Sequence, residues 1–297
     1  MTLVDSIRNH SVSIFFSLAF GISWLLTLAA VGPEGIFDAD TVYIAGPISL
    51  AGPSIAGILM TALVQGKEGF RNLVSRAIRW KVGTVWYAVA LLTAPMLIMV
   101  ILLLLSITSR DFLPTVFGAD DRIGLVLSGI FAGSVVAPFE ELGWTGFAMP
   151  EMRKRYGVNV TGLIMGVAWG AWHLPLFLGS TSSSGAVPSL LFISVLLFSF
   201  LVPYRILMVR MYDRTRSLLL VILMHLPLAA SQFILIPSSI SGGALLTFDL
   251  LFAAVLWVIV AAAAISACRV NDPRSHRCDG SRSEMSPAAH GSTEAMR

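Results

Sequence analysis

The chain has 297 residues and a formal net charge of +3, with 56% apolar residues and only 12% Lys, Arg, Asp and Glu. Soluble domains carry about 25% of these charged residues, so the composition excludes an ordinary soluble domain, a disordered chain and a nucleic-acid-binding module. It predicts an integral membrane protein that crosses the bilayer several times and binds no nucleic acid.

Eight segments are apolar over enough residues to cross a bilayer, since a spanning helix needs about 20. In chain order they are residues 12–32, 43–65, 84–108, 123–148, 159–178, 188–211, 217–238 and 244–268. We therefore predict an all-α fold, a polytopic bundle of about eight transmembrane helices in one membrane domain over 1–268. Residues 269–297 are rich in Ser, Arg and Pro without hydrophobic periodicity, and we expect a disordered cytoplasmic tail there.

The charges of the connecting segments predict the orientation of these helices. Basic residues are dense in residues 66–83, after the fourth and sixth spans and in the tail, whereas the alternate connections carry few. Because loops rich in Lys and Arg stay in the cytoplasm, both termini are expected there. The predicted location is the plasma membrane of a bacterial cell.

Four ionisable side chains fall well inside the predicted spans: Glu140 and Glu141 in the fourth, His173 in the fifth and His225 in the seventh. Such residues are costly in a bilayer and by default mark function. Glu140 and His225 lie roughly 12 Å from the inner ends of their spans, and His173 roughly 21 Å, so they can meet in the cytoplasmic half. Successive helix residues diverge by about 100°, so we expect one glutamate to act and the other to support it.

His173 shares a helix face with a ladder of glycines. Gly162, Gly166 and Gly170 are spaced four residues apart and form one stripe of small residues. Such a stripe allows a neighbouring helix to approach closely. The imidazole is therefore expected to point into the packed bundle and away from lipid.

A carboxylate and two histidines in a shielded cavity suit the hydrolysis of a peptide bond. The carboxylate can take a proton from water and make it a nucleophile toward an amide carbon. The histidines can hold a metal ion that polarises the same water, or stabilise the oxyanion as hydrogen-bond donors. The alternative is structural, with glutamates at the membrane interface and histidines that only join one helix to another.

The residues around the two glutamates resemble the first motif of a known family. The stretch 138–147 reads PFEELGWTGF. It is similar to E-E-x-x-x-R, the first motif of the CPBP family of CAAX proteases and bacteriocin-processing enzymes, also called Abi. Glu140 and Glu141 match its glutamates, whereas Thr145 stands where its arginine is usual.

Both histidines fall in stretches that resemble the other motifs of this family. Residues 169–177 are similar to F-x-x-x-H, with Trp169 at the first position and His173 at the last. His225 matches the start of H-x-x-x-N or H-x-x-x-D, with alanine in place of the usual Asn or Asp. The three motifs lie in the family's order within a core of about 123–238.

The resemblance implies an intramembrane endopeptidase that opens to the cytoplasm and cuts a CAAX-type protein, or processes a bacteriocin or another peptide. Glu140 would activate water and Glu141 would support it. His173 and His225 would bind a metal ion such as zinc together with Glu140, or would act without metal by stabilising the oxyanion. The implied partners are membrane lipid and a peptide or lipidated protein substrate.

The departures from the family pattern change which residues can support the site. Without an arginine at Thr145, Glu141 is either protonated or paired with another cation, for which Arg205 and Arg153 are the candidates. Without Asn or Asp at position 229, Gln232 is the nearest polar substitute, about one turn further along the helix. The residues expected to support the site are Thr145, Trp169, Arg205 and Gln232.

The same departures favour a second hypothesis, a catalytically weak or silent membrane protein of this family that acts as an immunity factor or scaffold. A third hypothesis is a small-solute or proton-coupled transporter that uses the two glutamates. The lack of an internal repeat argues against the transporter.

Overall fold

The computed structural model describes residues 3–38, 40 and 42–270, and throughout these residues the regular structure is helical. The predicted all-α membrane bundle is confirmed. The tail expected at 269–297 lies, from residue 271 on, outside the described residues. The elements are α1 (Leu3–Asn9), α2 (Ser11–Gly35), α3 (Val42–Ser49), α4 (Ala51–Met60), η2 (Thr61–Gln65), α5 (Gly66–Ala77), α6 (Thr84–Ser106), η3 (Arg110–Phe112), α7 (Thr115–Gly118), α8 (Arg122–Gly143), η4 (Trp144–Ala148), α9 (Met149–Arg153), α10 (Val158–Trp172), α11 (Leu174–Phe177), η5 (Gly179–Ser183), α12 (Ser189–Phe198), α13 (Leu201–Thr215), α14 (Leu218–Ile234) and α15 (Gly242–Val270).

Six helices of the described chain are long and apolar enough to cross a membrane. They are Ser11–Gly35, Val42–Val64, Thr84–Ser106, Arg122–Arg153, Ser189–Thr215 and Gly242–Ser266. Two further apolar helices, α10 and α14, have only 15 and 17 residues, less than the about 20 of a full span. All eight predicted segments are therefore helical, while the count of eight crossings and the cytoplasmic termini remain predictions.

The segment expected at 159–178 ends early because a proline follows the site histidine. Helix α10 stops at Trp172, His173 forms its C-cap, and Pro175 lies in the first turn of the short α11. A proline disfavours helical geometry in the residue before it and cannot donate a helix hydrogen bond. His173 therefore stands at the end of a helix and not in the middle of an unbroken span, as its expected depth assumed.

The segment expected at 188–211 extends to Thr215 but is interrupted between α12 and α13, at Ser199 and Phe200. Pro203 falls in the first turn of α13. The first turn is where a proline is tolerated, because its missing N–H would have no partner within the helix. The proline thus explains why a new helix starts just before it.

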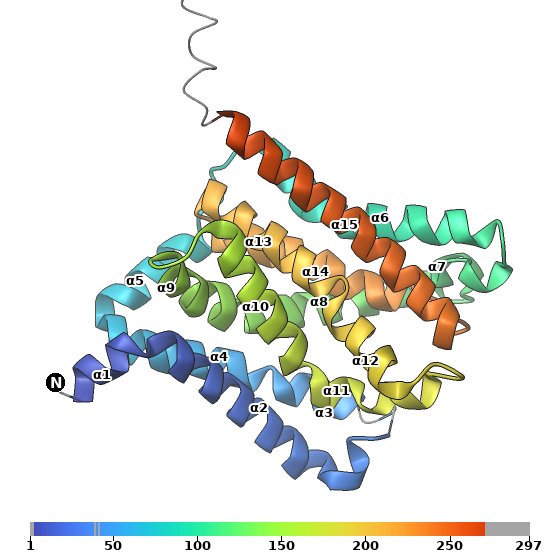
Figure 1. Ribbon diagram of the computed structural model, residues 1–297, viewed down its shortest axis with the longest axis horizontal. Coiled ribbons are helices and arrows are strands. Elements are labelled where there is room, and N and C mark those ends of the chain that lie inside the picture. The colour runs from blue at the N-terminus through green and yellow to red at the C-terminus, as the bar shows by residue number, and fades with distance from the viewer. Residues whose placement is uncertain (1–2, 39, 41, 271–297) are drawn as a thin grey trace, which may run out of the picture. The chain divides into compact units, whose positions relative to one another are not determined.

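Glycines allow the closest helix contacts in the centre of the bundle. Helix α10 packs on α13 (Figure 1), and a Cβ added to Gly166 would lie only 2.7 Å from the Cα of Val202 on α13. The glycine ladder therefore does admit a neighbouring helix. On α8, a Cβ added to Gly133 would meet the backbone carbonyl of Leu226 on α14, and α4 packs against α8 as well.

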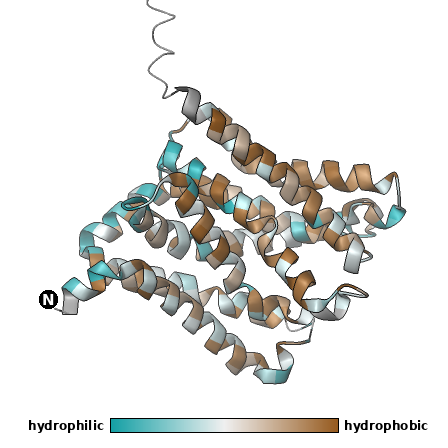
Figure 2. Cartoon of the chain, in the orientation of Figure 1, coloured by the Kyte–Doolittle hydropathy of each residue, from teal (hydrophilic) through white to brown (hydrophobic). Residues whose placement is uncertain are grey.

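The chain divides into two units, Met1–Leu256 and Trp257–Arg297. The first unit contains α1 to α14 and the first part of α15, with every residue discussed below. In the second unit the described residues form the C-terminal part of α15. Within the first unit, hydrophobic residues follow most of α6, whereas hydrophilic residues gather around α5 (Figure 2).

Candidate functional site

Four helices bring the predicted site residues together. Glu140 and Glu141 lie in the last turn of α8, His173 caps α10, Arg205 lies on α13 and His225 on α14. His173 is partly buried, and the other four side chains are at most 3% exposed. Helix packing therefore gathers five polar groups from separate parts of the chain into the protein interior.

Both carboxylate oxygens of Glu141 are occupied by donors. One guanidinium nitrogen of Arg205, Nη1, lies 3.0 Å from Oε1 and 2.9 Å from Oε2. His225 Nδ1 lies 2.9 Å from Oε1, and the Thr145 hydroxyl donates to Oε2 at 2.5 Å. A carboxylate held in this way is fixed in position and has little capacity left for a reacting water molecule.

Glu140 is engaged at one oxygen. Trp169 Nε1 donates to its Oε2 at 2.6 Å, and among the described residues no other side chain donates to this carboxylate. Its Oε1 therefore accepts no hydrogen bond from a side chain of the described residues, although Glu140 is only 2% exposed. The two adjacent glutamates point in different directions from the helix, as expected, and therefore have different partners. Glu140 has a side-chain donor at one oxygen, whereas Glu141 has donors at both.

Trp169 is the side chain that joins the parts of the site. The guanidinium carbon of Arg205 lies over its ring, 4.1 Å from the centroid. The rings of His225 and His173 meet it edge to face at centroid distances of 5.2 and 5.6 Å. Together with its hydrogen bond to Glu140, these contacts connect Trp169 to four of the five polar residues of the site. Trp169 therefore positions polar groups in addition to packing in the core.

The hydrogen bonds determine which nitrogen of each histidine carries a proton. His173 Nδ1 lies 2.7 Å from the backbone carbonyl of Trp169, and a carbonyl oxygen only accepts, so Nδ1 donates. His225 Nδ1 faces the carboxylate of Glu141 in the same way. In the neutral imidazoles the Nε2 atoms then carry lone pairs, ready to accept a proton or bind a metal ion.

The donor types suit zinc, but their arrangement does not. Two imidazoles, each oriented through Nδ1, and one carboxylate form a known catalytic zinc set. Within the described residues, however, no three His, Cys, Asp or Glu side chains come together to hold a metal ion. The set Glu140, His173 and His225 therefore does not form a ready metal site in this geometry.

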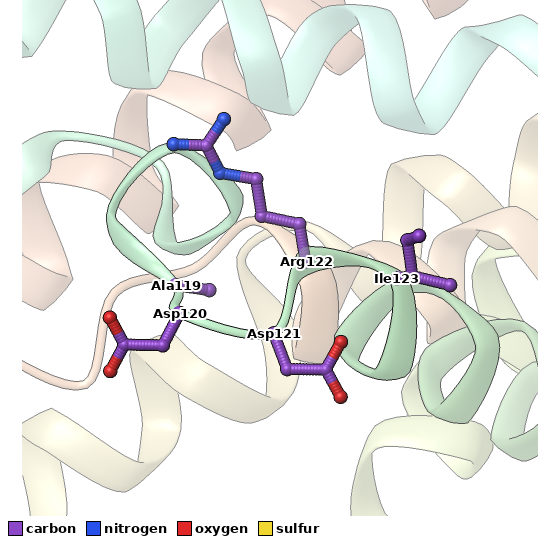
Figure 3. A pocket seen from close by; sticks show the side chains of 5 residues that line it. All are labelled: Ala119, Asp120, Asp121, Arg122 and Ile123. Carbon is purple, nitrogen blue, oxygen red and sulfur yellow. The ribbon is translucent and has the colours of Figure 1, made fainter.

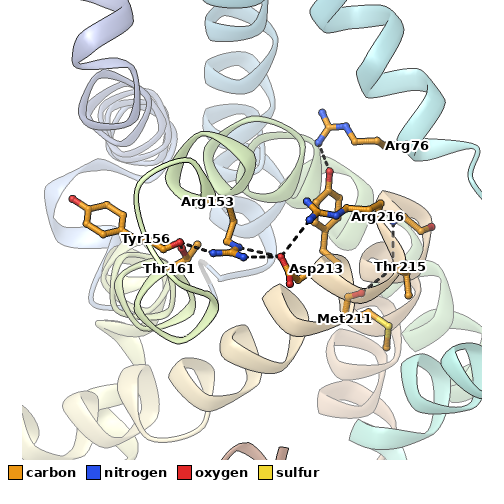
Figure 4. Close-up of polar contacts among 10 residues, drawn as sticks. Arg76, Arg153, Tyr156, Thr161, Met211, Asp213, Thr215 and Arg216 are labelled. Atoms are coloured by element: carbon orange, nitrogen blue, oxygen red, sulfur yellow. Dashed lines mark hydrogen bonds and ion pairs between the residues drawn. The ribbon is translucent and has the colours of Figure 1, made fainter. Parts of the chain in front are cut away.

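Of the other residues expected to support the site, some contact it and some do not. Arg205, and not Arg153, is the cation at Glu141, because Arg153 pairs with Asp213 at 2.8 and 3.1 Å (Figure 4). Gln232 is half-buried on α14, and in the described part of the chain it makes no hydrogen bond to a site residue. Gln232 therefore does not take the place of the missing Asn or Asp at the site.

Two buried hydroxyl groups that the sequence analysis did not identify hold the backbone beside the site. Tyr204 on α13 donates to the carbonyl of Met224, one residue before His225, at 2.7 Å. Ser54 on α4 donates to the carbonyl of Phe139, one residue before Glu140, at 2.6 Å. A polar residue inside an apolar span was the available signal, but it does not reveal which carbonyl the hydroxyl will reach.

A cavity of about 550 Å³ lies at the opposite end of α8. Residues 119–123 line it (Figure 3), and Asp121 there accepts a hydrogen bond from the amide of Gly124 at 2.8 Å, which caps α8. Most of the length of α8, roughly 28 Å, separates this loop from Glu140. Asp121 therefore caps the start of α8, and this cavity is remote from the glutamate site.

Comparisons with known proteins agree with the motifs. Residues 122–230 match the family model described as Type II CAAX prenyl endopeptidase Rce1-like, a segment that contains all five polar residues of the site. A relative from Methanococcus maripaludis named CAAX prenyl protease 2 is 34% identical over 74 residues, or 25% of this chain. The matched part covers only 22% of the relative's length. The resemblance to the CPBP family is confirmed for this segment, and the protein is an integral membrane protein with several spans.

Proposed function

We propose that the protein is an intramembrane endopeptidase that hydrolyses a peptide bond near the cytoplasmic face of the membrane, with Glu140 as the residue that activates water. The observation that carries this proposal is the pair of unequal glutamates. Glu141 is bonded at both oxygens, whereas among the described residues Glu140 Oε1 has no side-chain donor, and both histidines meet the tryptophan that holds Oε2. The match of residues 122–230 to a prenyl endopeptidase family supports the reaction class.

The proposed reaction begins with a water molecule at Oε1 of Glu140. The carboxylate takes one proton, and the resulting hydroxide adds to the carbonyl carbon of the scissile bond, which places negative charge on the carbonyl oxygen. When this intermediate collapses, the C–N bond breaks and the proton held by Glu140 passes to the leaving amine. The products are a new carboxylic acid and a new amine, which accounts for every atom of the water.

The histidines are proposed to stabilise the charged intermediate. Each has Nδ1 committed to an acceptor, so a histidine that takes a proton from solvent at Nε2 before the water is activated can donate that N–H to the oxyanion, and it keeps this proton when the products leave. For His225 the resulting cation lies next to Glu141, which in turn is held by Arg205. Glu141 is therefore a positioning residue in this mechanism and does not contact the substrate.

The substrate class we propose is a lipidated CAAX-type protein or another peptide processed at the membrane, reached from the cytoplasm of a bacterial cell. The name of the relative, CAAX prenyl protease 2, supports the prenylated substrate. Burial of the site among membrane helices supports a substrate that partitions into the bilayer. Membrane lipid is then both the solvent of the protein and the route by which such a substrate arrives.

The test is cleavage by the purified full-length protein in lipid nanodiscs. A fluorogenic peptide ending in a farnesylated CAAX sequence is compared with the same peptide lacking the lipid. Glu140→Gln keeps an acceptor for Trp169 but removes the base, so turnover should fall about 10²–10⁴-fold. Glu34→Gln, at an exposed glutamate outside both sites, serves as the matched control. Wild-type turnover by Glu140→Gln would disprove the role of Glu140, and cleavage of neither peptide by the unaltered protein would refute the activity.

Treatment with a chelator distinguishes the proposed metal-free mechanism from a metal-dependent one. After dialysis against EDTA the proposed mechanism predicts unchanged turnover. Loss of turnover that zinc restores would instead mean that His173 and His225 rearrange with Glu140 to bind a metal ion. Metal content measured on the same samples checks that dialysis removed any bound ion.

The second candidate function is a silent immunity factor or scaffold of the same family. The observation that favours it is the absent polar group at position 229, which Gln232 does not replace. It predicts that Glu140→Gln leaves the cellular phenotype of the protein unchanged. A phenotype that disappears with Glu140→Gln, while the protein remains folded in the membrane, contradicts it.

A further inference from the structure

A second polar cavity, of about 500 Å³, lies between α5, α9 and the C-terminal end of α13. Four basic and two acidic residues are among those that line it: Arg76, Arg79, Lys154, Arg216, Glu68 and Glu151. This surface belongs to the segments whose basic residues predict the cytoplasmic side. It takes no part in the glutamate site described above.

The two carboxylates of the cavity are already neutralised by other side chains. Lys154 Nζ lies 2.7 Å from both oxygens of Glu151, which also accepts from Gln65 at 2.6 Å. Glu68 pairs with Arg71, outside the lining, at 3.1 Å. The three arginines of the cavity are therefore not balanced by its own acids.

The arginines themselves find mostly neutral partners. Arg76 is only 8% exposed, yet it donates to the Tyr212 hydroxyl at 2.9 Å and the Gly146 carbonyl at 2.7 Å, and not to a carboxylate. Among the described residues Arg79 forms no ion pair. Arg216 lies 3.7 Å from Asp213.

The contact of Arg216 with Asp213 is a weak one, because Arg153 already binds that carboxylate at 2.8 Å (Figure 4). Within the described residues, Arg216 is therefore the one arginine of the cavity that contacts an acid, and Arg153 holds that acid more closely. Such an excess of positive charge attracts an anion, and guanidinium groups suit phosphate in particular because they donate in a planar fork.

The backbone of Arg216 adds a second observation. Its φ of 55° makes it the single non-glycine residue with positive φ in the described part of the chain. This position ends α13, where glycine is the usual residue because it has no Cβ to clash. The presence of an arginine at such a position is explained if its side chain is needed at the cavity.

The segment 74–81, beside the cavity, has the residue pattern of a segment that lies at a membrane surface. Val74, Ile78 and Trp80 are 56%, 67% and 63% exposed, although they are apolar and lie next to the arginines in sequence. Lys81 lies 5.5 Å from the centroid of the Trp80 ring. Exposed apolar and aromatic residues interleaved with cations are typical of segments at the headgroup level of a bilayer.

We propose that this cavity binds the phosphate of an anionic phospholipid headgroup, held by Arg79 and Arg216 at its rim and by Arg76 at its base. A lipid is favoured over free phosphate because the apolar side chains of 74–80 can contact acyl chains while the arginines hold the headgroup. Anionic lipids are enriched in the cytoplasmic leaflet, on the side predicted for this surface. The proposal does not depend on the proteolytic activity.

Equilibrium binding to the purified full-length protein in neutral detergent tests this proposal. Fluorescent phosphatidylglycerol should bind more tightly than fluorescent phosphatidylcholine. Arg79→Gln and Arg216→Gly should each weaken phosphatidylglycerol binding about fivefold, the effect of removing one cation near a headgroup. Arg214→Gln, which changes an exposed arginine of the same helix outside the cavity, should leave binding unchanged.

Arg216→Gly also separates binding from folding. Because glycine adopts positive φ without strain, this variant should melt at the same or a higher temperature while it binds the lipid less well. Equal binding of the two lipids, or unchanged binding by both arginine variants, would overturn the proposal. Inorganic phosphate that binds at the same affinity as phosphatidylglycerol, and displaces it, would show that the site takes free phosphate and would overturn the assignment to lipid.

Discussion

Arg205 on α13 contacts both carboxylate oxygens of Glu141 on α8 through one nitrogen, at 3.0 and 2.9 Å, and both side chains are at most 1% exposed. The related motif places an arginine one turn after this glutamate, where Thr145 stands here. The cation at Glu141 is therefore supplied from another helix. The threonine hydroxyl keeps a contact of its own with the same carboxylate, at 2.5 Å.

Removal of Arg205 should destabilise the protein strongly. Arg205→Met leaves Glu141 buried without its cation, and the loss of one partner of a buried ion pair costs about 3–5 kcal/mol. The measurement is the free energy of unfolding in mixed detergent micelles, with Arg214→Met, an exposed arginine of the same helix, as the control. A loss no larger than that of the control would mean that the pair does not hold the fold.

An arginine at the motif position should rescue the loss of Arg205. In Arg205→Met with Thr145→Arg, the new guanidinium lies four residues from Glu141 on one helical path and can donate to the same carboxylate. A hydrogen bond to a charged group contributes about 1.5–3 kcal/mol, so the double variant should regain about that much free energy of unfolding relative to Arg205→Met. A double variant that is no more stable than Arg205→Met would show that the two positions are not equivalent.

The apolar segments and the site residues could be predicted because their signals are local. Runs of about 20 apolar residues mark the helices, and a glutamate or histidine inside such a run stands out. Helix α10 ends at Trp172, before the expected end of the span at 178, because Pro175 stops the helix without making the segment less apolar. The break before Pro203 was missed for the same reason.

The partners of the site residues depend on packing between helices, which no local pattern describes. Both Arg205 and Arg153 were open candidates for Glu141 because each lies near the cytoplasmic ends of the spans. Packing decides between them, because Arg205 is buried against Glu141 whereas Arg153 pairs with Asp213. For the same reason, no local pattern predicts that Ser54 and Tyr204 donate to backbone carbonyls beside the site.

Loss of the indole N–H should impair catalysis more than folding. Trp169→Phe keeps an aromatic ring over Arg205 but removes the donor to Glu140 Oε2. Under the proposed mechanism the carboxylate loses its orientation, so kcat should fall about 10-fold or more, since a hydrogen bond to a charged group contributes about 1.5–3 kcal/mol, while KM changes little. Trp80→Phe, at an exposed tryptophan, is the control. A change confined to KM would place Trp169 in substrate binding and not in the orientation of Glu140.

The close contact of α10 with α13 should be sensitive to a single methyl group. A Cβ at position 166 would lie 2.7 Å from the Cα of Val202 and 3.4 Å from the Cβ of Arg205, so Gly166→Ala must push the two helices apart. Overpacking of this kind costs about 1–3 kcal/mol, and the same displacement carries Trp169 away from Arg205, so the free energy of unfolding and the cleavage rate should fall together.

Gly21→Ala on α2 is the matched control for this substitution. Nothing lies within 4 Å of a Cβ at Gly21, and alanine is favoured over glycine inside a helix by about 0.5–1 kcal/mol. This variant should therefore be slightly more stable and fully active. Because the two substitutions add the same atom to a helical glycine, opposite signs would isolate the contact with α13 as the cause. Equal effects would mean that the glycine ladder does not set the distance between α10 and α13.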